Sequence, residues 1–234
     1  VYAGFDHEKI DNPRVTNGHN RYSTFGGSEE KNIQPLYAQI NKDNISISHN
    51  GNITNAHYLK QNLLEDGCIF QSDMDTEVIL HLIAKSKETN IIEKIQDALR
   101  KVEGAYSLII TYNDEILAIR DPNGIRPLVL GKKDDGFVIS SETCGLDIIN
   151  ATFEREIDPG EILLINDKGT KTFSIANKVN KTFCIFEYIY FARPDSNFLN
   201  QNVYEARINI GKQLYLENKK NNSDIVIPVP DSGL

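Results

Sequence analysis

Between residues 18 and 167 the chain is a series of short apolar runs, each bounded by residues that favour turns. Residues 45–48 and 107–112 have the alternating or continuous apolar character of buried strands, and a turn after the second predicts a hairpin. Four further strands are expected over residues 115–119, 128–131, 137–140 and 161–165. Strands that are short and joined by tight turns favour antiparallel sheets.

Three segments among these strands have apolar residues at helical spacing. They cover residues 55–66, 75–87 and 90–102. In the first, Ala56, Leu59 and Leu63 form one apolar stripe, and Asn55 stands where a helix N-cap is expected. Because the helices are grouped rather than strictly alternating with the strands, the pattern predicts an α+β domain.

The C-terminal part of the chain differs from the rest. Residues 185–191 are rich in aromatics and are predicted to form a strand, and residues 204–218 are predicted to form a helix. Residues 224–230 have the pattern of a buried strand that begins an α/β domain. We therefore expect one domain over residues 1–182 and the start of a second over residues 183–234.

Charge and composition narrow the classes of function. The net charge of −8 argues against general binding to nucleic acid or to membrane surfaces. No apolar run reaches the roughly 20 residues that cross a bilayer, and the first residues lack a secretory signal. The three cysteines, an odd number without C-x-x-C spacing, predict neither a disulfide framework nor a metal knuckle, which favours a reducing cytoplasm.

The first of three polar clusters, GHNRYSTFGG, covers residues 18–27. The guanidinium of Arg21 offers a planar set of donors that suits a carboxylate, and the glycines let backbone approach a ligand. The alternative is a surface arginine beside a glycine turn.

The second cluster, HNGN at residues 49–52, directly follows a predicted strand. The side-chain amide of Asn50 and the N–H of Gly51 are two neutral donors that can stabilise the oxyanion of an acyl-transfer reaction. An Asn-Gly pair also predicts a tight turn. The two interpretations are compatible, because a turn at the end of a strand exposes donors.

The third cluster, SDMDTE at residues 72–77, precedes an apolar helix. Its acidic residues are typical of a helix cap, but Asp75 can also accept hydrogen bonds from a substrate ammonium. Arg21 and Asp75 would then hold the two charged ends of an α-amino acid. For Cys68 and Cys144 we favour buried thiols over nucleophiles, because neither lies near a recognisable base motif.

Together the three clusters resemble the glutaminase half of the class II glutamine amidotransferases, which have the N-terminal-nucleophile hydrolase fold. Residues 187–196, EYIYFARPDS, are similar to the branch that makes 5-phosphoribosylamine from phosphoribosyl diphosphate, the amidophosphoribosyltransferase family. Residues 121–128 and 228–233 fit the same branch. Met74 replaces a serine of the family pattern and leaves Asp75 in place.

The resemblance implies a four-layer αββα domain, followed by the first strand of a phosphoribosyltransferase domain. Arg21 and Asp75 would bind the α-carboxylate and α-ammonium of glutamine, with Thr24 as a further ligand. Asn50 and Gly51 would form the oxyanion hole. The family's nucleophile is the N-terminal cysteine of the mature chain, so we expect it upstream of Val1 and expect these residues alone to be inactive.

The resemblance also implies cofactors and partners. Mg²⁺ would bind in the phosphoribosyltransferase domain, and one branch of the family holds a [4Fe–4S] cluster whose first ligand would be Cys184, an ordinary buried thiol being the alternative. The substrates would be glutamine and phosphoribosyl diphosphate, used by a cytoplasmic homo-oligomer in the first step of purine synthesis. The motifs of the glutaminase half leave two alternatives open: another class II amidotransferase, of the sugar-isomerising or asparagine-synthetase type, or a glutamine-sensing module that has lost the nucleophile.

Overall fold

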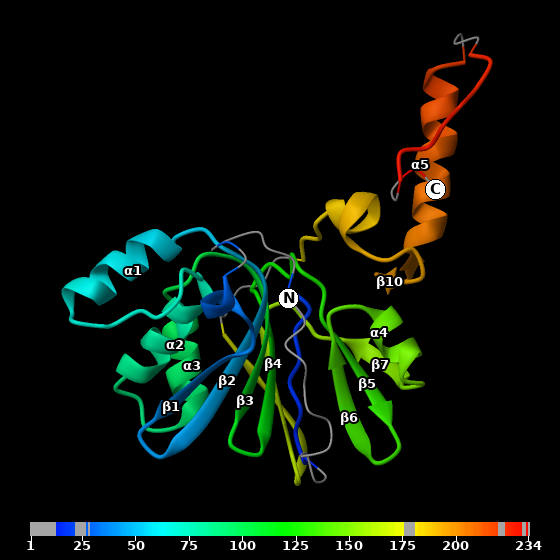
Figure 1. Cartoon of the computed structure of the whole chain (residues 1–234). Coiled ribbons are helices and arrows are strands. Elements are labelled where there is room, and N and C mark those ends of the chain that lie inside the picture. Colours follow the sequence, from blue (N-terminus) through cyan, green and yellow to red (C-terminus); the bar gives the residue numbers. More distant parts are fainter. Residues whose placement is uncertain are drawn as a thin grey trace.

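The computed structural model describes residues 13–21, 27, 29–175, 181–219, 223–230 and 233. Two antiparallel sheets lie face to face, with helices on the outer side of each (Figure 1). The larger sheet has the strand order β1 (Leu36–Ile40), β2 (Asp43–Ile53), β3 (Gly104–Tyr112), β4 (Glu115–Arg120), β8 (Glu161–Asn166) and β9 (Gly169–Ser174). The smaller has the order β6 (Gly136–Ser140), β5 (Val129–Lys133) and β7 (Thr152–Glu156).

Three apolar clusters lie between successive layers. The first joins the larger sheet to α1 (Ala56–Glu65), α2 (Thr76–Lys85) and α3 (Ile91–Leu99). The second lies between the two sheets, and the third joins the smaller sheet to α4 (Thr143–Ile148). The order helix, sheet, sheet, helix confirms the predicted four-layer α+β architecture.

Residues 116–119 of strand β4 show why this run is continuously apolar rather than alternating. Its residues Leu117 and Ile119 face the helices, whereas Ile116 and Ala118 face the smaller sheet. Because successive side chains of a strand point to opposite faces, a strand between two apolar layers needs apolar residues at every position.

The three predicted helices are confirmed, and Ala56, Leu59 and Leu63 are buried as expected. Asn55 stands at the predicted N-cap position of α1, but its side chain does not cap the helix. Its side-chain Nδ2 donates to Lys101 O at 2.9 Å and its Oδ1 accepts from Glu103 N at 3.0 Å, so Asn55 ties the start of α1 to the α3–β3 connection.

The prediction of a strand over residues 185–191 is wrong, because Glu187–Phe191 forms a short π-helix, η3. Helical spacing brings Tyr188 and Ala192 onto one face, where they pack with Phe198 and Val203. The following segment contains β10 (Asn197–Phe198), β11 (Gln201–Asn202) and α5 (Val203–Glu217), and α5 projects away from the two sheets (Figure 1).

The prediction of a buried strand over residues 224–230 is also wrong. These residues form no strand in the structure, and Ile225 and Val226 are 75% and 86% exposed. A strand needs a neighbour for its backbone N–H and C=O groups, and no strand in the described ranges provides one. In the same ranges, no helix combines the length and apolar character that a membrane span requires.

Candidate active site

The HNGN segment lies inside strand β2, so the tight-turn interpretation of residues 49–52 is wrong. Asn50 lies opposite Ser107 of β3, and Gly51 lies opposite Tyr106. The glycine is needed because the two strands approach closely: a Cβ at Gly51 would collide with the carbonyl oxygen of Ala105 and lie 2.8 Å from His49 Nε2. Pairing with β3 thus overrides the local preference of Asn-Gly for a turn.

Beyond Ile47, where the pairing with β1 ends, no other strand among the described residues pairs with this side of β2, which we call the open edge. Along this edge His49 N–H donates to Gln34 Oε1 at 2.6 Å, and Ile53 N–H donates to Asp75 Oδ2 at 2.9 Å. Since alternate N–H groups of a strand point to the same side, the N–H of Gly51 points to this edge as well. It lies between two N–H groups whose acceptors are side chains.

Asp75 stands at the N-terminus of α2, but its side chain does not cap that helix. Its carboxylate accepts hydrogen bonds from Ile53 N–H and, at 3.4 Å, from the Thr76 hydroxyl, and His49 Nδ1 is 3.6 Å away. Burial opposes ionisation, but His49 and the donors around it together hold the pKa of Asp75 below its usual range. Asp75 is therefore a buried carboxylate at the open edge of β2.

Glu77 and Ser72 shape the loop that leads to Asp75. The Glu77 carboxylate accepts from the N–H groups of Gln71 and Ser72, at 2.8 and 2.7 Å, and from the Ser72 hydroxyl at 2.6 Å. Because Glu77 accepts the hydrogen bonds of this loop, the carboxylate of Asp75 is available to accept from the backbone of β2.

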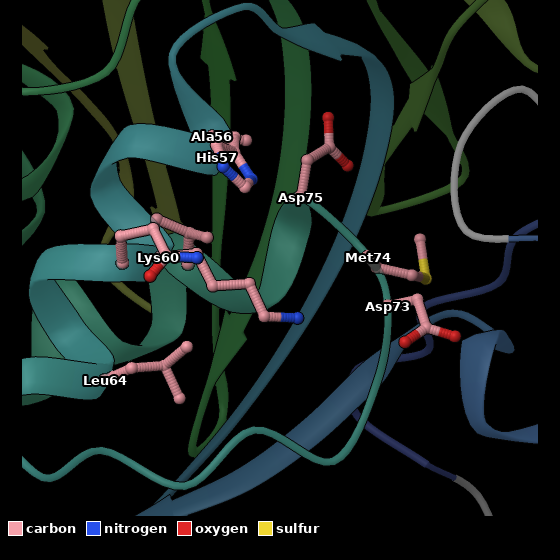
Figure 2. A pocket seen from close by; sticks show the side chains of 9 residues that line it. Ala56, His57, Lys60, Leu64, Asp73, Met74 and Asp75 are labelled. Atoms are coloured by element: carbon pink, nitrogen blue, oxygen red, sulfur yellow. The ribbon is translucent and has the colours of Figure 1, made fainter.

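A cavity of about 270 Å³ lies beside Asp75, between α1 and the loop before α2 (Figure 2). His57 and Lys60 of α1 line it, together with Asp73 and Met74. Lys60 Nζ donates to Ser72 O at 3.1 Å, which fixes the loop against α1. Of the predicted site residues that the structure describes, Asp75 lines this cavity, whereas Arg21, Asn50 and Gly51 do not.

The side chain of Asn50 lies on the face of β2 that points away from the helices. Ile47 and Ile53 face the helices, and side chains alternate along the strand. Asn50 Oδ1 accepts a hydrogen bond from Arg126 Nη2 at 2.8 Å. The Asn50 side chain thus lies on one face of β2, and Asp75 contacts the same residues 49–53 from the helix side. Both can reach the open edge of the strand.

Arg21 is half-buried, and Asn17 in the same segment bonds to β2, accepting from the Ser48 hydroxyl at 2.9 Å and donating to Ser46 Oγ at 3.4 Å. The pKa of His19 is lowered, first by burial and then by the neighbouring His49 and Arg21. Thr24 lies outside the described residues. The structure therefore brings Asp75 to His49 and to the backbone of Ile53, and places the Arg21 segment near them.

The three cysteines are free and lie in different parts of the structure. Cys68 packs against the helix layer, and Cys184 lies in the segment before η3, where its N–H is 3.4 Å from Ile125 O. Burial raises the pKa of the Cys144 thiol, which makes it a poor nucleophile.

A [4Fe–4S] cluster takes four thiolates. Among the described residues no three His, Cys, Asp or Glu side chains are grouped closely enough to bind a metal ion. The described residues thus provide neither further cluster ligands around Cys184 nor a Mg²⁺ site, and the role of Cys184 as a cluster ligand stays a prediction.

Residues 19–147, more than half of the chain, match the family model described as "Glutamine amidotransferase domain". The chain belongs to this family. The prediction made from the three polar clusters is thereby confirmed at the level of the amidotransferase domain.

Several proteins similar to this amidotransferase chain are named amidophosphoribosyltransferase. The chain is 44% identical over 218 residues to the amidophosphoribosyltransferase of Bacillus subtilis (strain 168), covering 93% of this chain and 46% of that protein. It is 46% identical over 218 residues to chloroplastic amidophosphoribosyltransferase 1 of Arabidopsis thaliana, covering 93% and 38%. The chain thus spans less than half the length of these curated relatives.

A solved structure shows the same similarity. The B. subtilis glutamine phosphoribosylpyrophosphate amidotransferase, complexed with ADP and GMP, matches with a TM-score of 0.85 and 43% identity, over 92% of this chain and 47% of that one. A match of this quality confirms the fold of the amidotransferase domain.

Sequence reasoning missed the contacts of two charged residues near Asn50: Arg126, which binds its side chain, and Glu187, which pairs with Arg126. Both stand in motifs that carried the family resemblance, but their meeting depends on contacts between segments distant in sequence. Burial raises the pKa of Glu187 to about 7, although Arg126 beside it has the opposite effect. An arginine two residues after an Asp-Pro-Asn-Gly turn and a glutamate in an aromatic segment were the available signals.

Proposed function

We propose that the chain is the glutaminase part of an amidophosphoribosyltransferase, in which ammonia released from glutamine forms 5-phosphoribosylamine from phosphoribosyl diphosphate. The 44% identity to a relative of that name over 93% of the chain supports the choice among amidotransferases. The observation that carries the glutaminase role is the open edge of β2, where the N–H of Gly51 lies two residues before the N–H that the carboxylate of Asp75 binds.

The spacing along this edge suits a glutamine molecule. The N–H groups of residues 51 and 53 are two positions apart, or roughly 6.7 Å in a strand, and Asp75 is bonded to the second. In the proposed complex Asp75 binds the α-ammonium, and the side-chain carbonyl oxygen of glutamine reaches the N–H of Gly51. Arg21 binds the α-carboxylate, and Thr24 is proposed as a further ligand.

The proposed reaction is an acyl transfer to a thiol. A thiolate attacks the side-chain amide carbon of glutamine, and the oxygen becomes an oxyanion that receives hydrogen bonds from Gly51 N–H and Asn50 Nδ2. The α-amino group of the nucleophilic residue passes the proton taken from the thiol to the amide nitrogen, the C–N bond breaks and ammonia leaves. Water then cleaves the glutamyl thioester to glutamate and the free thiol. Cys68, Cys144 and Cys184 lie in other parts of the fold, so we propose that the thiolate belongs to the N-terminal cysteine that this class uses.

The remaining parts of the proposal concern the whole protein. We propose that phosphoribosyl diphosphate and Mg²⁺ bind in a phosphoribosyltransferase domain and that the protein is a homo-oligomer. Three free cysteines suit a reducing compartment, and we propose the cytoplasm.

The function is tested by replacing Arg21 with lysine in the full-length protein. A lysine keeps the charge but loses the planar pair of donors, so KM for glutamine should rise about tenfold or more. The rate with added ammonia in place of glutamine should be unchanged, because ammonia bypasses the amino-acid site. Steady-state kinetics with the two nitrogen donors measure both quantities.

Arg14→Lys is the matched control, since Arg14 is an exposed arginine that pairs with Asp167 on the surface. It should leave KM for glutamine unchanged. An unchanged KM in Arg21→Lys as well would remove Arg21 from the site, and a protein without activity on glutamine or ammonia would contradict the proposed function.

A further inference from the structure

The backbone of Arg126 is held firmly by the turn that follows β4. Asp121, which is fully buried, accepts from the N–H groups of Asn123 and Ile125 at 2.9 and 3.0 Å. The guanidinium of Arg120 donates to Arg126 O at 2.8 Å and to Gly124 O at 2.9 Å. With its backbone fixed in this way, Arg126 projects its side chain from a rigid base.

The side chain of Arg126 bridges two distant parts of the chain. Nη2 donates to Asn50 Oδ1 at 2.8 Å, and Nη1 lies 2.8 Å from Glu187 Oε1 in a close ion pair. The guanidinium carbon is 4.8 Å from the centre of the Phe191 ring. Glu187 and Phe191 both belong to η3, so one guanidinium connects β2 to the segment that leads toward α5.

This contact determines which way the Asn50 amide points. A guanidinium carries only donors, so the atom of Asn50 that faces it must be the oxygen. The amide nitrogen then points elsewhere and keeps its N–H groups for another acceptor. A positive charge on the oxygen side also polarises the amide, which makes its N–H groups stronger donors.

The ion pair with Glu187 keeps Arg126 in this position. The Glu187 side chain is 3% exposed and that of Arg126 is 20% exposed, and Arg126 opposes the rise that burial causes in the pKa of Glu187, so the contact favours the charged form of both. Without Glu187, the guanidinium would gain by turning toward solvent and leaving Asn50.

We propose that Arg126 is a positioning residue for glutamine hydrolysis: it holds the Asn50 amide with its nitrogen available to the oxyanion, and Glu187 in η3 holds Arg126. The proposal rests on the function proposed above. If so, the strength of the oxyanion-hole donors depends on η3, the short helix between the two sheets and α5.

The test is Arg126→Gln in the full-length protein, because a glutamine side chain can present either its oxygen or its nitrogen to Asn50. We expect kcat with glutamine to fall about tenfold to a hundredfold, with KM for glutamine and the ammonia-dependent rate changed less than about twofold. Arg126→Lys, which still presents only donors, should recover much of kcat. In an Asn50→Ala background, Arg126→Gln should lower kcat no further.

Arg155→Gln is the matched control, since Arg155 also makes a paired contact with a buried glutamate, Glu161, but in another part of the fold. It should leave kcat unchanged. If Arg126→Gln fails to fold, Glu187→Gln replaces it as the test, with a loss of kcat at constant KM expected.

A normal kcat in Arg126→Gln, or an equal loss of glutamine- and ammonia-dependent rates, would overturn the proposal. The proposed function would still stand in either case if Asn50→Ala and Arg21→Lys lost glutamine use alone. Normal glutamine kinetics in all three variants would instead contradict the proposed function.

Discussion

Gly51→Ala is expected to reduce glutamine-dependent turnover more than about a hundredfold, because a donor displaced by ~1 Å no longer meets the developing oxyanion. The added Cβ would collide with the Ala105 carbonyl oxygen, which belongs to the backbone of β3 and cannot rotate away. It would also lie 2.8 Å from His49 Nε2, and the φ of 155° is one that residues with side chains rarely adopt. Strands β2 and β3 must therefore separate at this point, which moves the N–H of Gly51.

The same collision should lower the melting temperature of the full-length protein by several degrees, since overpacking a buried site costs about 1–3 kcal/mol. Gly136→Ala is the control: its Cβ would have an ordinary contact of 3.5 Å with Lys133 O in the β5–β6 hairpin. Gly136→Ala should change neither the glutamine-dependent turnover nor the melting temperature. A Gly51→Ala protein with normal turnover would show that this N–H does not serve the reaction.

Asn50→Ala is expected to lower kcat for glutamine about a hundredfold or more, which is the effect of losing one oxyanion donor. Only the transition state carries the full negative charge, so KM should change little. The change also leaves Arg126 Nη2 without the partner that it has at 2.8 Å. Ammonia-dependent synthesis should continue at the normal rate, and comparison of the two nitrogen donors measures the effect.

Asn44→Ala is the matched control for Asn50→Ala, because Asn44 is an exposed asparagine near the other end of β2. Its replacement should leave the kinetics unchanged. If Asn50→Ala retained a near-normal rate with glutamine, Asn50 would be a structural partner of Arg126 and no part of the oxyanion hole.

Much of the fold could be predicted because the local apolar pattern and the tertiary environment agree. Leu117 and Ile119 in β4, for example, belong to a run that is apolar at every position and buried on both faces. Edge strands β1, β7 and β9 were not predicted, since their half-exposed residues give a weak pattern. The aromatic residues 187–191 suit a strand or a helix equally, and packing with Phe198 and Val203 decides for the helix.

The residue types of the site could be predicted, but their geometry could not. The motifs identified Asn50, Gly51 and Asp75, whereas the Asn-Gly pair suggested a turn that strand pairing with β3 overrides. The contact of Arg126 with Asn50 joins residues 76 positions apart, and no local pattern reports such a contact. Long-range contacts of this kind depend on how the layers pack.

The most direct test of the account is a crystal structure of the full-length protein with L-glutamine bound and the nucleophilic thiol blocked. We expect the α-ammonium to contact the carboxylate of Asp75 and the α-carboxylate to contact Arg21. The side-chain carbonyl oxygen should lie within hydrogen-bond distance of Gly51 N–H and Asn50 Nδ2. Glutamine bound instead in the cavity between α1 and the loop before α2, with Gly51 N–H turned to solvent, would contradict it.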